Sequence, residues 1–149
     1  MVWLFSKYRQ RRGGALWIRN IHKSLLKCSW RASELLSEAH ELLEKGSYKS
    51  ANNRAFYAIE KSIKALLAIV GKDSQTYSGG LKQFNFEFIY KGDGSFVQDD
   101  YQIAAKAERI RNASDYDDFY IASKEEAQQQ VLNAEYIVRK VERYILEKL

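Results

Sequence analysis

Proline is absent from the 149-residue sequence, and there is a single cysteine, Cys28. Without proline, no helix has to kink or break at one. A lone cysteine excludes an internal disulfide and any cysteine-clustered zinc site, and a reduced, cytoplasmic setting fits it best. No apolar run approaches the roughly 20 residues that span a bilayer, so we expect no membrane association. The apolar start of the chain is short and precedes the basic residues, the reverse of a secretory signal.

Histidine is almost as scarce, since the chain has only His22 and His40. Both fall on one predicted helix, where a rise of about 1.5 Å per residue separates them by roughly 27 Å. They therefore cannot share a metal ion or a substrate within one chain. The sequence also lacks a phosphate-binding glycine loop and a dinucleotide fingerprint. These observations predict neither a metal nor a cofactor.

Acidic residues are missing from the first 33 positions, which carry eight basic side chains. The other 116 residues have 16 basic against 19 acidic side chains, so the net charge of +5 comes from the N-terminus. We interpret residues 1–16 as a basic arm. Such an arm binds nucleic acid or an acidic partner, or it is a solvated extension that the fold does not need.

The apolar spacing of the remaining residues, 17–149, is typical of long helices. From Ile18 to Leu42 the apolar positions recur in steps of three and four, which predicts a helix over about 17–45 that ends at Gly46. The same pattern predicts helices over 47–70 and over about 97–113. Ser123 and Glu126 form a capping-box pattern that opens a last helix through Ile145.

The segment 81–92 is ambiguous because Phe84, Phe86 and Phe88 have strand spacing, whereas Leu81, Phe84 and Phe88 have helix spacing. A lone strand would have no partner, so we favour a short helix here. We expect a chain break at residues 78–80 and a loop at 91–95. The whole pattern predicts an all-α protein, an antiparallel up-and-down bundle of four to five helices.

Two polar groups of residues stand out. Arg54, Tyr57 and Lys61 share one face of the second predicted helix, beside its apolar stripe. Residues 109–120 place two arginines near three aspartates where the next long helix ends. Spacing alone leaves a purely structural explanation open for each group. Arg54 and Lys61 can be surface side chains that extend along the protein beside a core tyrosine, and residues 109–120 can form local ion pairs and a helix cap.

The stretches ANNRAFYAIEKSIKALL (51–67) and RNASDYDDFY (111–120) resemble the HEPN domains (higher eukaryotes and prokaryotes nucleotide-binding). The closest pattern is that of a small stand-alone prokaryotic branch with NRAYYA and R-x-x-A-D-Y-D motifs, and the resemblance covers about residues 20–146. It implies a helical homodimer, commonly encoded beside a minimal nucleotidyltransferase in toxin–antitoxin or related stress and defence pairs. It also implies a nucleotide or RNA as ligand.

Many HEPN domains are metal-independent endoribonucleases whose motif is Arg, a polar residue and, four to six residues on, His. The resemblance maps Arg111 and Asn112 onto the first two positions and Tyr116 onto the histidine. Tyrosine, with an ordinary pKa near 10, is a poor general base at pH 7 compared with histidine near 6.5. Glu60 and Lys61 also stand where relatives often have an aromatic residue and then histidine.

Three hypotheses follow from these residues. The first is a non-catalytic or weakly catalytic partner subunit of a nucleotidyltransferase, the second an active ribonuclease toxin, and the third a nucleic-acid-binding module that works through the arm. The candidate catalytic residues are Arg111, Asn112 and Tyr116. The candidate nucleotide- or partner-binding residues are Arg54, Tyr57, Lys61, Arg109, Asp115 and Asp117.

Overall fold

The computed structural model describes residues 16–148, with side chains from residue 22 onward, and this part of the chain is helical without strands. The basic arm predicted at residues 1–16 therefore lies essentially outside the described part. The helices are α2 (Leu16–Glu44), α3 (Tyr48–Ile69), α4 (Tyr77–Phe84), a π-helical turn η1 (Asn85–Tyr90), α5 (Gln98–Tyr116) and α6 (Lys124–Lys148). The predicted all-α bundle is confirmed. None of these helices is both long and apolar enough to cross a membrane.

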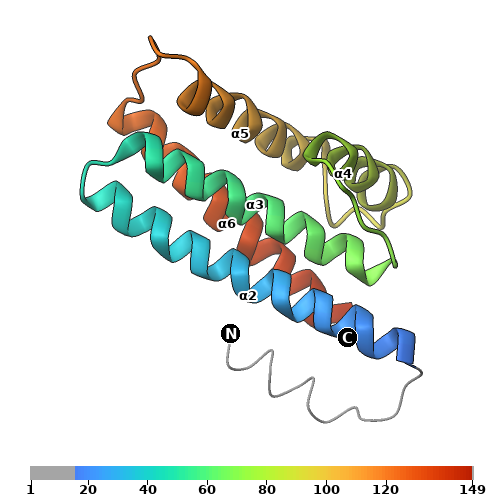
Figure 1. The fold of residues 1–149 in the computed structure, drawn as a ribbon. Helices are drawn as coiled ribbons and strands as arrows, with labels where there is room; N and C mark the ends of the chain where they lie inside the picture. The colour runs from blue at the N-terminus through green and yellow to red at the C-terminus, as the bar shows by residue number, and fades with distance from the viewer. Residues whose placement is uncertain (1–15, 149) are drawn as a thin grey trace.

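Helix α3 is the centre of the bundle. It contacts α2, α5 and α6, and α4 packs near its end (Figure 1). Alanines at positions 51, 55, 58 and 65 are almost completely buried, and their small side chains let neighbouring helices approach closely. Ile59, Leu66 and Leu67 fill the remaining space in the core.

The predicted boundaries of α2 and α3 agree with the structure to within one residue. Gly46 and Gly71 have φ angles of +76° and +68°, the left-handed conformation that glycine adopts without strain. After each glycine the chain hydrogen-bonds back to the helix, as in Ser47 N–H to Leu42 O at 2.9 Å. Helix α6 begins as predicted, since the Ser123 hydroxyl accepts from the Glu126 N–H at 3.0 Å.

The segment 77–90 is helical, as favoured, but the predicted chain break at residues 78–80 is wrong. Thr76 caps α4 by accepting from the Gly79 N–H at 3.1 Å, so both glycines lie inside the first turns of the helix. A Cβ on Gly79 would lie only 2.9 Å from Ser74 Oγ. Close packing, rather than a turn, therefore accounts for this glycine.

Helix α5 continues to Tyr116, three residues beyond the predicted end. The Asp117 N–H donates to Ala113 O at 3.1 Å, which closes the last turn. Arg111 and Asn112 lie within the helix as predicted, whereas Asp115 and Tyr116, expected beyond its end, belong to its last turn. The loop begins only at residue 117.

Candidate functional site

Arg111 lies at the centre of a polar site between α5 and α3. Its Nη2 donates a hydrogen bond of 2.9 Å to the Tyr57 hydroxyl, and its Nη1 donates to Asn112 Oδ1 at 3.1 Å. Its Nε lies 3.0 Å from Asp115 Oδ2, a charge contact between residues one helical turn apart that lacks hydrogen-bond alignment. The predicted local ion pair is thus present, and it coexists with a long-range contact to α3.

Three aromatic rings surround the Arg111 guanidinium. Its central carbon lies 5.3 Å from the ring centroid of Phe56, 5.5 Å from that of Tyr57 and 5.7 Å from that of Tyr116. Each distance is within the range of a cation–π attraction. Phe56 is buried and holds its position against Tyr77, with ring centroids 4.7 Å apart. The guanidinium is therefore positioned by packing as well as by hydrogen bonds.

Burial by itself lowers the pKa of the Arg111 guanidinium. The Tyr57 hydrogen bond and the nearby Asp115 and Tyr116 outweigh that effect, so the net pKa is raised. Arg111 is accordingly a permanent cation, and it cannot serve as a proton donor or acceptor near neutral pH.

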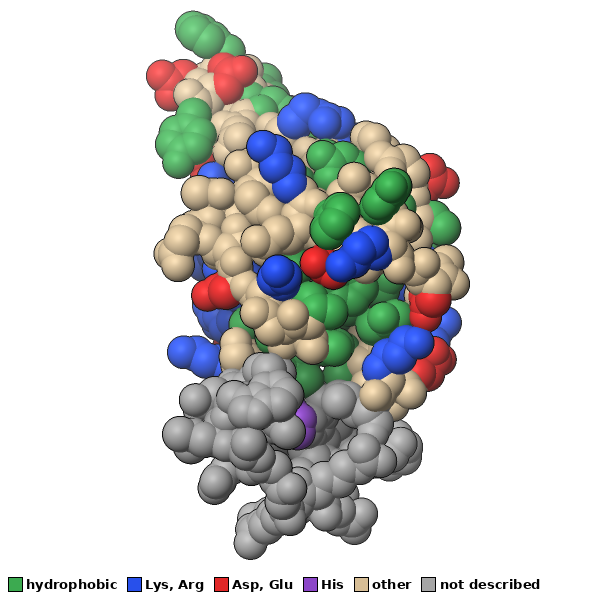
Figure 2. All heavy atoms as spheres, turned by 90° about the vertical axis from the view of Figure 1, so that its right-hand side faces the viewer, with side chains coloured by type: hydrophobic (Ala, Val, Ile, Leu, Met, Phe, Trp, Pro, Cys, Tyr) green, Lys and Arg blue, Asp and Glu red, His purple; other side chains and the backbone are tan. Residues whose placement is uncertain are grey.

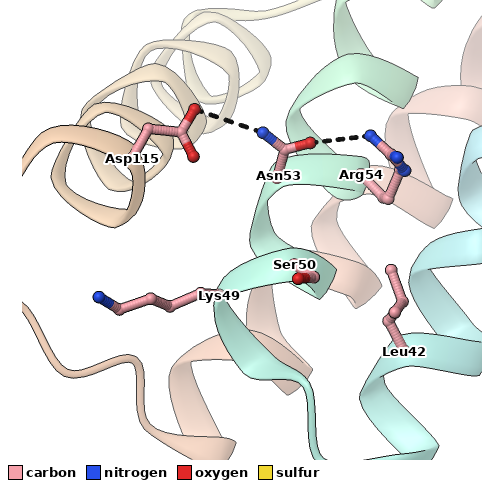
Figure 3. Close-up of a pocket in the computed structure, with 6 residues that line it drawn as sticks. All are labelled: Leu42, Lys49, Ser50, Asn53, Arg54 and Asp115. Carbon is pink, nitrogen blue, oxygen red and sulfur yellow. Dashed lines mark hydrogen bonds between the residues drawn. The ribbon is translucent and has the colours of Figure 1, made fainter.

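Asp115 connects this site to a hollow of about 290 Å³ at the start of α3 (Figure 3). Asn53 bridges two charged residues there: its Nδ2 donates to Asp115 Oδ2 at 3.4 Å, and its Oδ1 accepts from Arg54 Nη1 at 3.0 Å. Arg54 Nε also pairs with Glu38 on α2 at 2.7 Å. A chain of contacts thus runs from α5 across α3 to α2.

The structure brings together most, but not all, of the predicted site residues. Tyr57, Arg111, Asn112, Asp115 and Tyr116 form one cluster, and Arg54 joins it through Asn53.

Three other candidates have no contact that places them in this cluster. Lys61 acts electrostatically on the Cys28 thiol of α2, Arg109 is exposed on α5, and Asp117 accepts from the Phe119 N–H at 2.9 Å in the following loop. The shared helical face predicted for Arg54, Tyr57 and Lys61 therefore does not form one site.

Sequence reasoning missed Asn53 and Phe56. Both lie on the side of α3 that faces α5, and both fall within the stretch that carries the family resemblance. Their spacing of three residues places them on one helical face, which was the available signal. Only the position of α5 in the bundle shows that this face is the one opposite Arg111.

The HEPN domain model matches residues 27–144 of the chain. This protein belongs to the HEPN domain family. The resemblance found in the sequence is thereby confirmed, and the matched range includes every residue of the Arg111 site.

Three curated relatives illustrate the extent of the similarity. A protein of Methanocaldococcus jannaschii named "Putative toxin" is 32% identical over 119 residues, which cover 79% of this chain and 86% of the relative. A UPF0332 protein of Archaeoglobus fulgidus is 28% identical over 110 residues, or 74% and 86% of the two chains. A UPF0332 protein of Thermotoga maritima is 40% identical over 62 residues, or 42% and 47%.

Tyr116, the residue that the family resemblance maps onto the ribonuclease histidine, is 75% exposed. Both histidines of the chain lie on α2, and His40 lies 3.9 Å from Glu135 of α6. No group of three His, Cys, Asp or Glu side chains among the described residues is arranged to hold a metal ion. The cluster offers a cation and several hydrogen-bonding groups to an anion or a polar partner, and neither histidine of the chain belongs to it.

Proposed function

We propose that this HEPN protein is a homodimeric, non-catalytic or weakly catalytic partner subunit of a minimal nucleotidyltransferase. The pair would act in a toxin–antitoxin-like or stress and defence system, with a nucleotide held at the Arg111 site. One observation carries this proposal. Arg111 of the family motif is present and held by contacts to its neighbours, whereas exposed Tyr116 stands where the motif has its histidine base.

The neighbours of Arg111 support this proposal over an active nuclease. Cleavage of RNA through its 2′-hydroxyl needs a group that accepts a proton near neutral pH, and the resemblance places Tyr116 where the family has a histidine for this task. Asp115 also occupies one side of the guanidinium, and exposed Asp117 and Asp118 add negative charge nearby. These charges repel an extended phosphodiester backbone, whose successive phosphates would pass Asp117 and Asp118, whereas a single nucleotide would occupy only the site around Arg111.

A ribonuclease assay in the presence of a metal chelator tests the catalytic part of the proposal. We expect little cleavage at pH 7 by the purified protein, and a gain of cleavage in Tyr116→His because histidine restores a base next to Arg111. Arg111→Ala, prepared identically, controls for contaminating nuclease. Strong cleavage by the wild type that disappears in Arg111→Ala would show an active ribonuclease.

The second candidate is a metal-independent endoribonuclease toxin, and the name of the M. jannaschii relative supports the toxin part of it alone. It would have to use Arg111, Asn112 and Tyr116 for catalysis.

Light scattering tests the homodimer. We expect a mass of about twice the 17.3 kDa chain at micromolar concentration. A purely monomeric species would contradict this part of the proposal.

A further inference from the structure

The connection between α5 and α6 exposes large apolar side chains at one end of the bundle. Phe119 is 94% exposed, Ile121 87% and Tyr116 75%. In Figure 2, hydrophobic and acidic side chains gather at the top of the molecule, where Figure 1 shows this connection. We refer to residues 116–121 as the tip. Clustered exposure of this kind marks an interaction site rather than ordinary surface.

Hydrogen bonds hold the tip in a defined conformation. Asp117 accepts from the Phe119 N–H through its side chain at 2.9 Å and from the Tyr120 N–H through its carbonyl at 3.1 Å. Tyr120 is turned inward, with its ring centroid 6.0 Å from Lys49 Nζ on α3. The outward direction of Phe119 and Ile121 is therefore built into the loop, so little ordering entropy would be lost on binding.

A hollow of about 560 Å³ lies beside the tip. Its walls are the start of α3, including Lys49, and the residues Asp118, Tyr120 and Ile121. A partner side chain can enter it while the partner's surface covers Phe119. The tip thus combines a protruding apolar group with a concave neighbour, the shape of a protein-binding surface.

The charge around the tip indicates which kind of partner fits. Residues 115–126 contain five acidic side chains and one lysine, whereas the whole chain carries a net charge of +5. Because Asp115 pairs with Arg111, and Lys49 is the cation that lines the adjoining hollow, the negative charge of the tip itself comes from Asp117 and Asp118. In a twofold dimer the same patch meets itself, so self-association through the tip would bring like charges together. The charge therefore favours a different protein, with Lys and Arg around an apolar patch.

We propose that the tip is the docking surface for the nucleotidyltransferase partner, which contributes an apolar patch bordered by Lys and Arg. This inference rests on the proposed partnership. Phe119 and Ile121 supply the apolar contact, and Asp118 supplies a charge at the rim.

Binding of the full-length protein to a purified minimal nucleotidyltransferase from the same organism, measured by calorimetry, tests the inference. The double variant Phe119→Ser, Ile121→Ser removes only exposed side chains, and we expect its affinity to fall at least about tenfold. We expect Asp118→Lys to lower the affinity by roughly fivefold and to reduce its salt dependence, because rim charges act through screened attraction.

Two matched variants control for general surface effects. Tyr90→Ser removes an aromatic side chain that is 80% exposed on η1, and Glu147→Lys reverses an exposed charge near the end of α6. Both should bind like the wild type, and circular dichroism should show unchanged folding for all four variants.

The outcomes separate the two proposals. If the wild type does not bind the nucleotidyltransferase, the partnership fails and the tip assignment fails with it. If the wild type binds and the tip variants bind equally well, only the tip assignment is overturned. If the tip variants instead convert a wild-type dimer to monomer, a second copy occupies the tip and the inference is wrong.

Discussion

Helix α5 carries a charged network at each end, and the two networks differ in burial. Near its start, Asp100 is completely buried. Its carboxylate accepts from the Val97 N–H at 2.9 Å, from the Tyr136 hydroxyl at 2.8 Å and from Lys140 Nζ at 2.7 Å. These contacts close the first turn of α5 and tie it to α6.

Near the other end, the Arg111 and Asp115 side chains remain 21% and 30% exposed. This network ties α5 to α3 through Tyr57 and Asn53 and opens onto the hollow of Figure 3. In the Asp100 network, hydrogen-bond donors surround the buried carboxylate, so a ligand cannot reach it. The second network is accessible, so we expect Asp100 to stabilise the fold and Arg111 to serve the binding role proposed above.

The largest effect that would test this difference is expected for Asp100→Ala. Removing the buried carboxylate leaves Lys140 and the Val97 N–H without their partner, which should cost about 3–5 kcal/mol of the free energy of unfolding. Urea denaturation followed by circular dichroism measures this loss. If the free energy of unfolding changed by less than about 1 kcal/mol, the Asp100 network would contribute no more than an exposed ion pair, and the two networks would not differ in structural importance.

Arg111→Ala should have a smaller effect on stability. The guanidinium is partly exposed, so its loss should cost about 1–2 kcal/mol, with helix content and dimerisation nearly unchanged and nucleotide or partner binding weakened. A thermal melt and a binding assay on the same preparation measure both effects. A large drop in melting temperature that Asp115→Ala reproduces, with binding unchanged at low temperature, would make Arg111 structural instead.

A third attachment of α5, between the two networks, should respond to high pH. Tyr77 donates to Ala104 O at 2.9 Å, and burial raises the pKa of this tyrosine above its ordinary value of 10. The folded state then keeps a proton that the unfolded state releases, so stability is intact below pH 10 and falls as the pH rises further.

Tyr77→Phe should lose about 1 kcal/mol at pH 7, and its stability should decline less steeply above pH 10 than that of the wild type. Denaturation curves at intervals between pH 8 and 11 measure the two slopes. Equal slopes would mean that the Tyr77 hydroxyl is not the group responsible.

The smallest effect is expected for a pair that is fully exposed. Asp93 and Lys148 lie 2.9 Å apart, and hydrogen bonds from Ser95 and Lys148 lower the pKa of the Asp93 carboxyl. Asp93→Asn should not change the melting temperature measurably at pH 7, because solvent screens such pairs. If Asp93→Asn lowered the melting temperature as much as Arg111→Ala does, solvent exposure would not explain how much each charged network contributes to stability.

Much of the fold was predictable from local sequence signals. The apolar spacing, the glycine at 46 and the cap at Ser123 depend on residues within one or two turns of each other. The error at residues 78–80 has a local cause as well. Gly79 is needed because a larger side chain would collide with Ser74, but in the sequence a glycine pair looks the same as a turn. The end of α5 was missed because the Arg111–Asp115 pair extends the helix past its last apolar position.

The sequence by itself determined the helical class, most helix boundaries and the family. Each of these depends on residue identity and short-range spacing. Only the tertiary structure decided that Arg111 contacts Tyr57 and Phe56, that Asp100 is buried, and that Phe119 and Ile121 point outward. The physical reason is that a helix presents several faces, and its periodicity alone does not say which face meets which neighbour.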